Sequence, residues 1–517
     1  MLKAELQLIR YAFLIRLFVF FMQILIAPFP DHAADAFQPP SSDLSSPINS
    51  VLSYFLRGYR RWDAIYFCFI ARWGYIYEQS LAFFPLLPIV LNFFEKLTHP
   101  LFKDLLSSDL LILVCGILFN QVCGVITTVL LYRLSLIVLG SQRVSYCAAL
   151  LYCVNPALIF FCTVYSESLF FLLLLIGLLF YEKRQTFLAS VFFSLTCACR
   201  SNGLINVGYL VYILWTSGIG GLIWNKQSAA TTIRSSLSFV WACFAWWCKL
   251  SLIVLPYTLM CLLCIAPFFL FQAYAYCLYC SKLPFGLADW ILPKPPATEL
   301  IQFGIESGYR FPFSLSFSTV ENYSKLSPPW CLSDTPLSYS HIQSSYWNVR
   351  LFGYFELKQI PNFLLTAPVV VLGIACASSF YSRAPRAYLT LGLRAECEKD
   401  RQLVPYIFHM LFLMMYGITH INVQVLTRIL FSSCPVLYWF AAYVISSAPQ
   451  WRQLEGFDAP ISLAHGRISP RLSDLLKLFS LLNPRNYPLK RQKLVVFYFL
   501  GYASIGCLLH SKFLPWT

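Results

Sequence analysis

Long apolar runs recur along nearly the whole chain, and they constrain its fold more than any other feature. Only 12% of the residues are charged and 58% are hydrophobic, whereas a soluble domain has about a quarter charged residues. Many of the runs approach the ~20 residues with which a helix crosses a bilayer. They are continuous rather than alternating, which disfavours a membrane β-barrel. The sequence therefore predicts an all-α polytopic membrane protein.

The apolar runs predict about 10–12 transmembrane helices. The first, from Tyr11 to Ala27, is longer than the core of a signal peptide and no clear cleavage site follows it. We interpret it as an anchor, with a cleaved signal peptide as the alternative. The run 82–97 contains two prolines, which predicts an interfacial or re-entrant helix, and the tryptophan-rich run 235–250 is placed at the interface. Other spans are expected at 109–132, 144–163, 167–181, 185–200, 202–217, 252–275, 362–381, 403–419, 425–446 and 494–511.

Basic residues gather in the short loops between the runs. The formal net charge is +15, but this placement is typical of the positive-inside bias rather than of nucleic-acid binding. Arg16, inside the first run, is expected to reach the membrane surface. Alternate crossings from a cytosolic N-terminus put five basic segments in the cytosol: 133–143, 183–184, 226–234, 383–401 and 452–493.

We expect residues 1–517 to form a single membrane domain. Counting alternate membrane crossings also assigns its longer loops to the two sides of the membrane. A first loop at 29–108 and a large loop at 281–361 are predicted on the lumenal side, and a basic loop at 448–493 on the cytosolic side. The chain's one N-x-S/T sequon begins at Asn322 and predicts a glycosylation site in the large lumenal loop.

The 19 cysteines lie mostly inside apolar runs, where they are expected to be small buried side chains. Cys277, Cys280 and Cys331 lie in stretches better suited to an oxidising lumen, but the sequence leaves their pairing open. No paired array with zinc spacing is present.

Five polar clusters fall on the predicted lumenal side. An ionisable group near a membrane span is costly and suggests function, although a helix cap or an interfacial salt bridge explains each cluster taken alone. Because all five clusters fall on the same side of the membrane, we predict that they form one active site. The clusters are Arg61–Asp63 with Tyr77 and Glu78, Tyr165–Ser168, Arg200–Gly203, Tyr346–Arg350 with Tyr354–Glu356, and His420–Gln424 with Thr427 and Arg428.

Ordered motifs run through these clusters and beyond them. They are Arg61–Phe67, Phe83–Pro88, Asn155-Pro156, Tyr165–Phe170, Arg200–Gly203, Pro329–Cys331, Tyr346–Val349, Tyr354–Phe363, Val423–Arg428, Pro435–Trp439 and Leu514–Thr517. In this order the motifs resemble the PIG-V family of mannosyltransferases of the endoplasmic reticulum. The resemblance implies a GT-C type glycosyltransferase, multi-pass in the endoplasmic reticulum membrane. It implies transfer of the second mannose, in α-1,6 linkage, from dolichyl-phosphate-mannose to the glycosylphosphatidylinositol (GPI) precursor. It also implies a small membrane-protein subunit in some organisms.

An inverting transfer from a lipid phosphate gives the clusters roles. Asp63 is predicted to take the proton of the attacking hydroxyl, and Arg61, Arg200 and Arg428 to bind the leaving phosphate. Because arginines supply this charge, no metal and no other cofactor is predicted. Sugar or acceptor binding is predicted for Trp62, Tyr77, Glu78, Glu167, Asn202, Trp347, His420 and Gln424.

Three other functions compete with this interpretation. Another dolichol-phosphate-dependent glycosyltransferase would share the chemistry and differ in its acceptor. A lipid or solute transporter would place its charges near the midplane, often in repeated halves, whereas this sequence shows no internal repeat. A non-catalytic scaffold subunit would not need Asp63.

Overall fold

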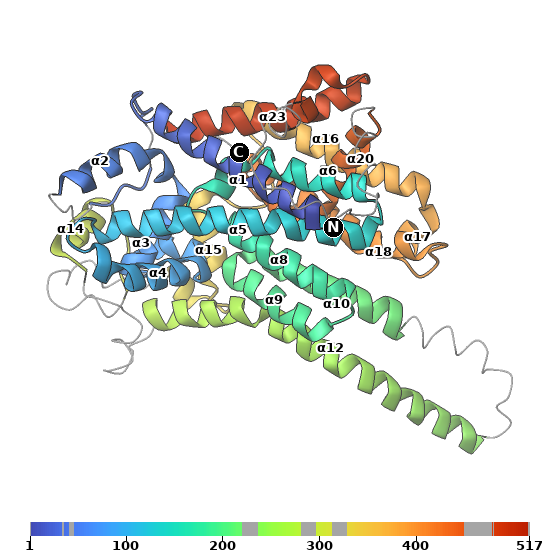
Figure 1. Cartoon of the computed structure of the whole chain (residues 1–517). Coiled ribbons are helices and arrows are strands. Elements are labelled where there is room, and N and C mark those ends of the chain that lie inside the picture. Colours follow the sequence, from blue (N-terminus) through green and yellow to red (C-terminus); the bar gives the residue numbers. More distant parts are fainter. Residues whose placement is uncertain are drawn as a thin grey trace.

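The computed structural model describes residues 2–33, 36–40, 46–219, 236–280, 296–312, 328–448, 478 and 480–514. In this part of the chain every regular element is a helix, which confirms the all-α prediction (Figure 1). The elements are α1 Leu2–Ile26, α2 Pro47–Leu56, η1 Arg57–Tyr59, α3 Asp63–Trp73, η2 Glu78–Ala82, α4 Leu86–Phe102, α5 Ser108–Leu139, α6 Gln142–Cys153, α7 Leu158–Cys162, α8 Glu167–Glu182, α9 Thr186–Cys199, η3 Ser201–Asn206, α10 Val207–Ile213, η4 Leu214–Ile219, α12 Ser236–Tyr279, α14 Thr298–Glu306, η6 Pro329–Leu332, α15 Ser338–Trp347, η7 Leu357–Gln359, α16 Ile360–Arg383, α17 Pro385–Leu389, α18 Glu398–His420, η8 Val423–Val425, α19 Leu426–Ser433, α20 Pro435–Ser446, η10 Pro484–Asn486 and α23 Lys490–Ser511.

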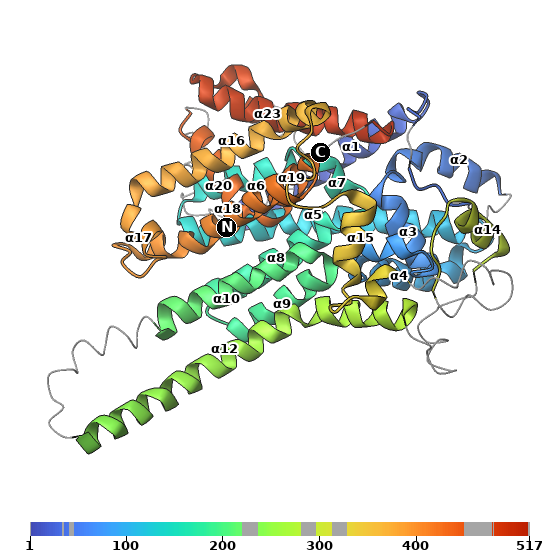
Figure 2. The same ribbon diagram turned by 180° about the vertical axis from the view of Figure 1, so that it is seen from behind.

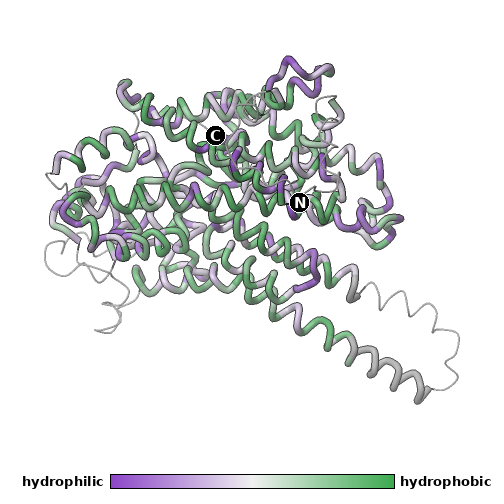
Figure 3. Tube along the Cα trace, viewed as in Figure 1, coloured by the Kyte–Doolittle hydropathy of each residue, from purple (hydrophilic) through white to green (hydrophobic). Residues whose placement is uncertain are grey.

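Six helical segments of the described chain are long and apolar enough to cross a membrane, and α19 with α20, bent by 82°, would make a seventh. The multi-pass prediction is therefore confirmed. The helices α6, α8, α9 and α10 form where spans are predicted but have fewer than 18 residues, so their crossing stays a prediction. Hydrophobic residues lie along most of the helices, whereas hydrophilic residues gather around α17 and in the segment before α23 (Figure 3). The six segments are Leu2–Ile26, Ser108–Leu139, Leu250–Tyr279, Leu357–Arg383, Glu398–His420 and Lys490–Ser511.

The tryptophan-rich run 235–250 is, from Ser236 on, continuous with the span predicted at 252–275, whereas its placement at the membrane interface stays a prediction. It is the beginning of α12, a single helix of 44 residues that extends away from the other helices (Figure 1). At 1.5 Å per residue such a helix is ~66 Å long, about twice the ~30 Å hydrocarbon core of a bilayer. The run 82–97 forms most of α4, which begins directly after Pro85 and lies along α5.

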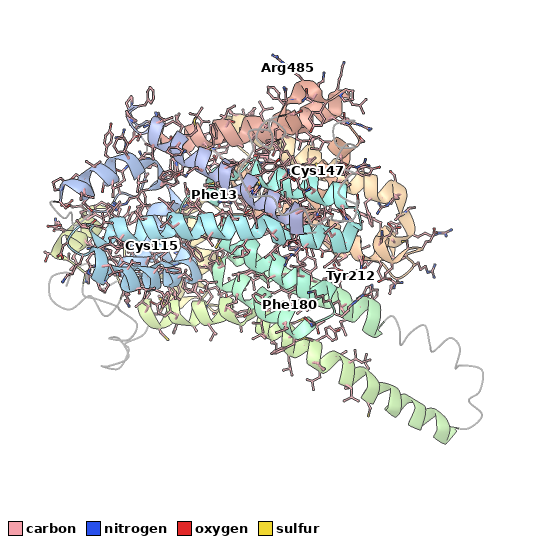
Figure 4. The ribbon with its side chains drawn as sticks, viewed as in Figure 1. Phe13, Cys115, Cys147, Phe180, Tyr212 and Arg485 are labelled. Carbon is pink, nitrogen blue, oxygen red and sulfur yellow. A yellow bond between two sulfur atoms is a disulfide. The ribbon has the colours of Figure 1, made fainter. Side chains whose placement is uncertain are left out.

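Loops that are predicted to share the cytosolic side meet at one end of the helix bundle. Arg184 lies 3.7 Å from Glu398, and the Tyr212 hydroxyl donates to the Arg401 carbonyl at 2.7 Å. The N-terminal ends of α3 and α8 lie toward the opposite end, next to α15 and α19 (Figure 2). Arg485, from the predicted basic cytosolic loop, lies at the periphery beyond α23 (Figure 4). The Arg184–Glu398 contact joins two of the predicted cytosolic loops, and the assignment of the loops to two sides of a membrane stays a prediction.

Arg16 lies in the interior instead of reaching the membrane surface, which corrects the prediction. Arg16 is only 5% exposed. Its guanidinium donates to the Phe161 carbonyl at 2.9 Å and to Gln121 Oε1 at 3.1 Å. The reason is that α1 packs between α5, α6 and α7, so that the middle of α1 has protein partners for a charge. Arg16 thereby satisfies one carbonyl near the C-terminal end of the short helix α7, just before the loop that leads to α8.

Candidate active site

Asp63 and Arg428 form an ion pair at the centre of the site. Asp63 is the first residue of α3, where the free N–H groups of the first turn favour a carboxylate. Arg428 is the third residue of α19, and its Nη1 lies 2.6 Å from Asp63 Oδ2. The Asp63 side chain is 29% exposed, so that the pair is open to a substrate. Within the described chain, the hydrogen bond to this carboxylate uses Oδ2, which leaves Oδ1 for a substrate hydroxyl.

Glu167 continues this pair into a line of four charges. Its Oε1 lies 3.7 Å from Arg428 Nε and forms a second ion pair with Arg200. Glu167 is almost fully buried, and the two arginines are each 15% exposed. We call Asp63, Arg428, Glu167 and Arg200 the acid–arginine chain. Two positive and two negative charges alternate along it, which is how charges are accommodated in a low-dielectric interior.

The loop that carries Glu167 is held by hydrogen bonds on both sides. Asn155-Pro156 lies between α6 and α7, and a break is expected there because the residue before a proline avoids helical backbone. After α7, Asn120 of α5 donates to the Tyr165 carbonyl at 2.9 Å. The Ser168 hydroxyl donates to the Phe161 carbonyl at 2.7 Å. Glu167 is therefore fixed as the first residue of α8 by contacts that reach back to α5 and α7.

Two aromatic rings lie beneath Arg428. The guanidinium carbon is 5.2 Å from the centre of the Phe160 ring and 5.6 Å from that of Tyr165, within cation–π range. His510 of α23 supports Tyr165, with Nε2 3.2 Å from the phenol oxygen. The sequence analysis missed Phe160 and His510 as site residues, since nothing in an apolar run marks one ring as the partner of an arginine.

Arg61 lies in a different environment from Asp63, although only Trp62 separates them. Arg61 Nη2 lies 2.8 Å from Asp31, its Nε donates to the Ser511 carbonyl at 3.1 Å, and its guanidinium lies 4.2 Å from the centre of the Phe513 ring. Burial lowers the pKa of Arg61, and the Asp31 carboxylate opposes that shift. Trp62 has a φ of 49°, unusual for a large side chain.

This turn directs Arg61 and Asp63 to separate clusters. Arg61 joins the ends of α1 and α23, and its predicted role in phosphate binding remains a prediction.

Tyr77 and Glu78 are fully buried and are bound by protein partners. The Tyr77 hydroxyl donates to the Leu300 carbonyl at 2.6 Å. Glu78 accepts hydrogen bonds from the Trp330 indole at 2.8 Å and the Tyr346 hydroxyl at 2.9 Å. These contacts hold the segment around Trp330 and the helix α15 against η2, so both residues act on structure in this state of the protein, and their predicted sugar contacts stay predictions.

Cys331, which directly follows Trp330, forms a disulfide with Cys280 at the end of α12. The sequence left this pairing open. The segment that carries Cys331 packs against α15, and Trp347 of α15 contacts Tyr66, one turn after Asp63.

The other predicted sugar-binding residues lie on four different segments of the fold. Asn202 donates to Ser433 Oγ at 2.9 Å, at the bend between α19 and α20. The Trp347 ring centre is 6.4 Å from that of Tyr66, one turn after Asp63 on α3. His420 stacks on Tyr416 at 4.6 Å. Gln424 is half-buried in η8, four residues before Arg428.

The structure does not describe Asn322, so the predicted glycosylation site lies outside the described residues. Within the described ranges no group of three or more His, Cys, Asp or Glu side chains could hold a metal ion. Independence from metal stays a prediction, as does the absence of any other cofactor.

The geometry thus combines a partly exposed carboxylate with two arginines. The carboxylate can accept a proton from a hydroxyl, and the arginines can stabilise negative charge on a leaving phosphate. Of the predicted residues, Asp63, Glu167, Arg200 and Arg428 are brought into direct contact. This arrangement suits transfer of a group from a phosphate to a hydroxyl.

Comparison with known proteins agrees with this chemistry. A sequence profile of the family described as Mannosyltransferase (PIG-V) matches residues 4–517. The GPI alpha-1,6-mannosyltransferase 2 of Cricetulus griseus is 35% identical over 529 residues, which cover 99% of this chain and 98% of the relative. The human protein of that name is 34% identical, with 99% and 98% coverage, and the Drosophila melanogaster GPI mannosyltransferase 2 is 30% identical, with 83% and 88% coverage.

Among solved structures, the archaeal oligosaccharyltransferase AglB from Archaeoglobus fulgidus aligns with a TM-score of 0.39 and 13% identity. The alignment covers 97% of this chain and 56% of the archaeal chain, so this chain spans about half of that protein's length. The GT-C architecture therefore rests on the family resemblance. The profile match over almost the whole length and the relatives above 30% identity are decisive: the chain belongs to the PIG-V family of mannosyltransferases.

Proposed function

We propose that this mannosyltransferase adds a mannose in α-1,6 linkage to the GPI precursor, with dolichyl-phosphate-mannose as the donor and inversion at the transferred carbon. The observation that carries the proposal is the ion pair between Asp63 and Arg428, which places a partly exposed proton acceptor beside a cation. The names of the relatives supply the linkage and the acceptor class.

A single displacement accounts for the reaction. The acceptor hydroxyl attacks the anomeric carbon of mannose and gives its proton to Asp63 Oδ1, while the bond from that carbon to the phosphate oxygen breaks. Dolichyl phosphate leaves with the bonding electrons, and its added charge is stabilised by arginine. Arg200 is the more available of the two cations, because Arg428 already contacts two carboxylates and Arg200 one.

The disulfide supports a lumenal site. Disulfides persist in oxidising compartments such as the lumen of the endoplasmic reticulum, and the segment of the Cys280–Cys331 bridge packs against α15, whose Trp347 contacts Tyr66, one turn after Asp63. We therefore propose that the acid–arginine chain faces the lumen of the endoplasmic reticulum. The lipid-linked donor and the precursor glycolipid would reach it from the bilayer, and a small membrane-protein subunit is part of the proposal.

The experiment is transfer by purified protein in detergent, with radiolabelled dolichyl-phosphate-mannose and the one-mannose GPI precursor. Formation of a two-mannose product that an α-1,6-specific mannosidase cleaves is the expected result. Transfer from the same donor to a different lipid-linked glycan, with none to the precursor, would favour the alternative dolichol-dependent glycosyltransferase. Absence of transfer to any acceptor, from protein that remains folded, would contradict an enzymatic role for the site.

A further inference from the structure

A cavity next to α15 contains none of the residues of the acid–arginine chain and is not explained by it. Its volume is about 310 Å³, and it is lined by residues of α15, the turn that follows, η7 and η8. This volume is at the lower end of the ~300–1,000 Å³ that is typical of ligand pockets. The lining combines aromatic rings with charged and amide groups: Tyr346, Trp347, Tyr354, Glu356, Lys358 and Asn422. Rings beside hydrogen-bonding groups are what a carbohydrate needs, because a sugar presents apolar faces and polar edges.

The walls of the cavity are held by short-range hydrogen bonds. Asn348 adopts a left-handed backbone conformation, with φ of 54°, and its side chain donates to the Gly353 carbonyl at 3.0 Å. Asn362 of α16 donates to the Tyr354 hydroxyl at 2.8 Å. Asn422 donates to the Trp347 carbonyl at 3.3 Å. The cavity is therefore formed before a ligand arrives, which lowers the entropy cost of binding.

Two residues connect the cavity to the reacting groups. Trp347 lines the cavity and contacts Tyr66, which lies one turn after Asp63. Asn422 lines it as well, six residues before Arg428 along η8 and α19. A ligand in this cavity thus lies next to the substrate of Asp63 rather than in the same place.

The cavity also lies where a lipid head group is expected. Its η7 residues begin the candidate membrane span Leu357–Arg383. Large apolar side chains around it are more than half exposed, Phe352 by 54%, Phe355 by 51% and Leu357 by 87%. An exposed apolar patch beside a polar cavity, at the end of a membrane span, suits a molecule with a polar head and acyl chains.

The charges in the cavity narrow the choice of ligand. Glu356 Oε2 lies 2.6 Å from Lys358 Nζ, and both side chains are largely exposed, at 45% and 73%. Such an exposed pair contributes little to stability, so a ligand can separate it. A ligand that carries one cation and one anion would satisfy both groups. The donor lipid has a phosphate and no amine, whereas a GPI precursor has the amine of glucosamine and the phosphodiester of inositol phospholipid.

We propose that this cavity binds the inner head group of the acceptor glycolipid, with the glucosamine ammonium on Glu356 and the inositol phosphodiester near Lys358. The acceptor mannose then extends past Trp347 toward Asp63. This inference rests on the proposed function, since it names the acceptor subsite of the same reaction. No bond is made or broken in the cavity.

The test measures acceptor KM and kcat separately for the purified protein and for Glu356→Gln, with the natural acceptor and with its N-acetylated form. Loss of the pairing with the ammonium is expected to raise the acceptor KM about 3- to 10-fold, the effect of one partly exposed charged hydrogen bond. N-acetylation removes the ligand cation and should raise KM by a similar factor for the unmodified protein, but not further for Glu356→Gln. Glu396→Gln is the matched control, because Glu396 also forms an exposed pair, with Arg386 at 2.7 Å, beyond the far end of α16.

Failure of the inference is distinguishable from failure of the proposed function. If the protein transfers mannose to the precursor but Glu356→Gln and N-acetylation change KM independently, or not at all, the cavity proposal is overturned and the function stands. If no transfer occurs, binding of the fluorescent natural acceptor to protein in nanodiscs is measured instead. Binding that weakens on both changes without additivity supports the cavity, and binding that is insensitive to Glu356→Gln overturns it.

Discussion

The Arg428 guanidinium lies 2.6 Å from the Asp63 carboxylate, although 365 positions separate the two residues in the chain. The contact joins the first turn of α3 to α19, one of the two helices of the bent pair. Because Arg428 also contacts Glu167, which contacts Arg200, one arginine connects the proposed base to the proposed phosphate site.

Asp63→Asn is expected to reduce transfer by about 10²–10⁴-fold, because the amide keeps the shape of the side chain but cannot accept the proton. The measurement is kcat in the mannose-transfer assay, at equal amounts of folded protein by size-exclusion chromatography. Asp104→Asn is the control, since Asp104 is exposed in the turn between α4 and α5. Near-normal turnover by Asp63→Asn would remove Asp63 from the role of base.

Arg200→Lys is expected to lower donor turnover by roughly 10–100-fold, since a lysine loses the planar, paired hydrogen bonds of a guanidinium to phosphate. The acceptor KM should change less than the donor kcat/KM. Arg401→Lys serves as the control, because Arg401 pairs with Glu398 at the opposite end of the bundle. A larger effect on the acceptor than on the donor would contradict the assignment of Arg200 to the phosphate.

Glu78→Gln is expected to lower the free energy of unfolding by about 1–3 kcal/mol, because an amide nitrogen then faces a hydrogen-bond donor inside the protein. Glu78 is fully buried and accepts from both Trp330 and Tyr346. Thermal unfolding of the detergent-solubilised protein, followed by tryptophan fluorescence, measures the change. An unaltered unfolding midpoint would show that these hydrogen bonds contribute nothing to stability.

Cys331→Ser is expected to destabilise the protein by ~2–4 kcal/mol, since it releases a loop that the disulfide closes. The Cys280–Cys331 bridge spans 51 residues. The shift of the unfolding midpoint under non-reducing conditions is the measurement, with Cys248→Ser as control, because Cys248 is a free, exposed cysteine of the same helix. If reductant lowers the midpoint of Cys331→Ser as much as that of the unmodified protein, the stabilisation comes from elsewhere.

Chelation is expected to leave transfer unchanged, because arginine supplies the positive charge that a metal would otherwise bring to the phosphate. The assay is run after dialysis against EDTA and again after Mg²⁺ or Mn²⁺ is restored. A loss of activity that either ion reverses would show that the reaction uses a metal.

The sequence was sufficient to predict the class of fold and the residues of the acid–arginine chain, but not which residues touch. Hydropathy predicts helices, and alternate crossings put Asp63, Glu167, Arg200 and Arg428 on one face. It does not predict that Arg61 turns away from Asp63, because that depends on the backbone of Trp62 and on Asp31 and Phe513, which come from opposite ends of the chain.

Helix boundaries and contacts between distant residues could not be predicted from the sequence. The extension of α12 back to Ser236 is not visible in hydropathy, because tryptophan is common both in helices and at membrane interfaces. The partners of Glu78 were not predictable either, since Trp330 and Tyr346 are 252 and 268 positions away.

The interior position of Arg16 has a consequence for biosynthesis. Its partners Gln121 and Phe161 follow it by 105 and 145 residues, and a ribosome that adds ~5–20 residues per second needs roughly 7–30 s to produce them. During that interval the newly made α1 carries a permanent cation without its final ligands, in a segment that belongs in lipid. We therefore expect α1 to reach its native surroundings only after α5 and α7 have been synthesised.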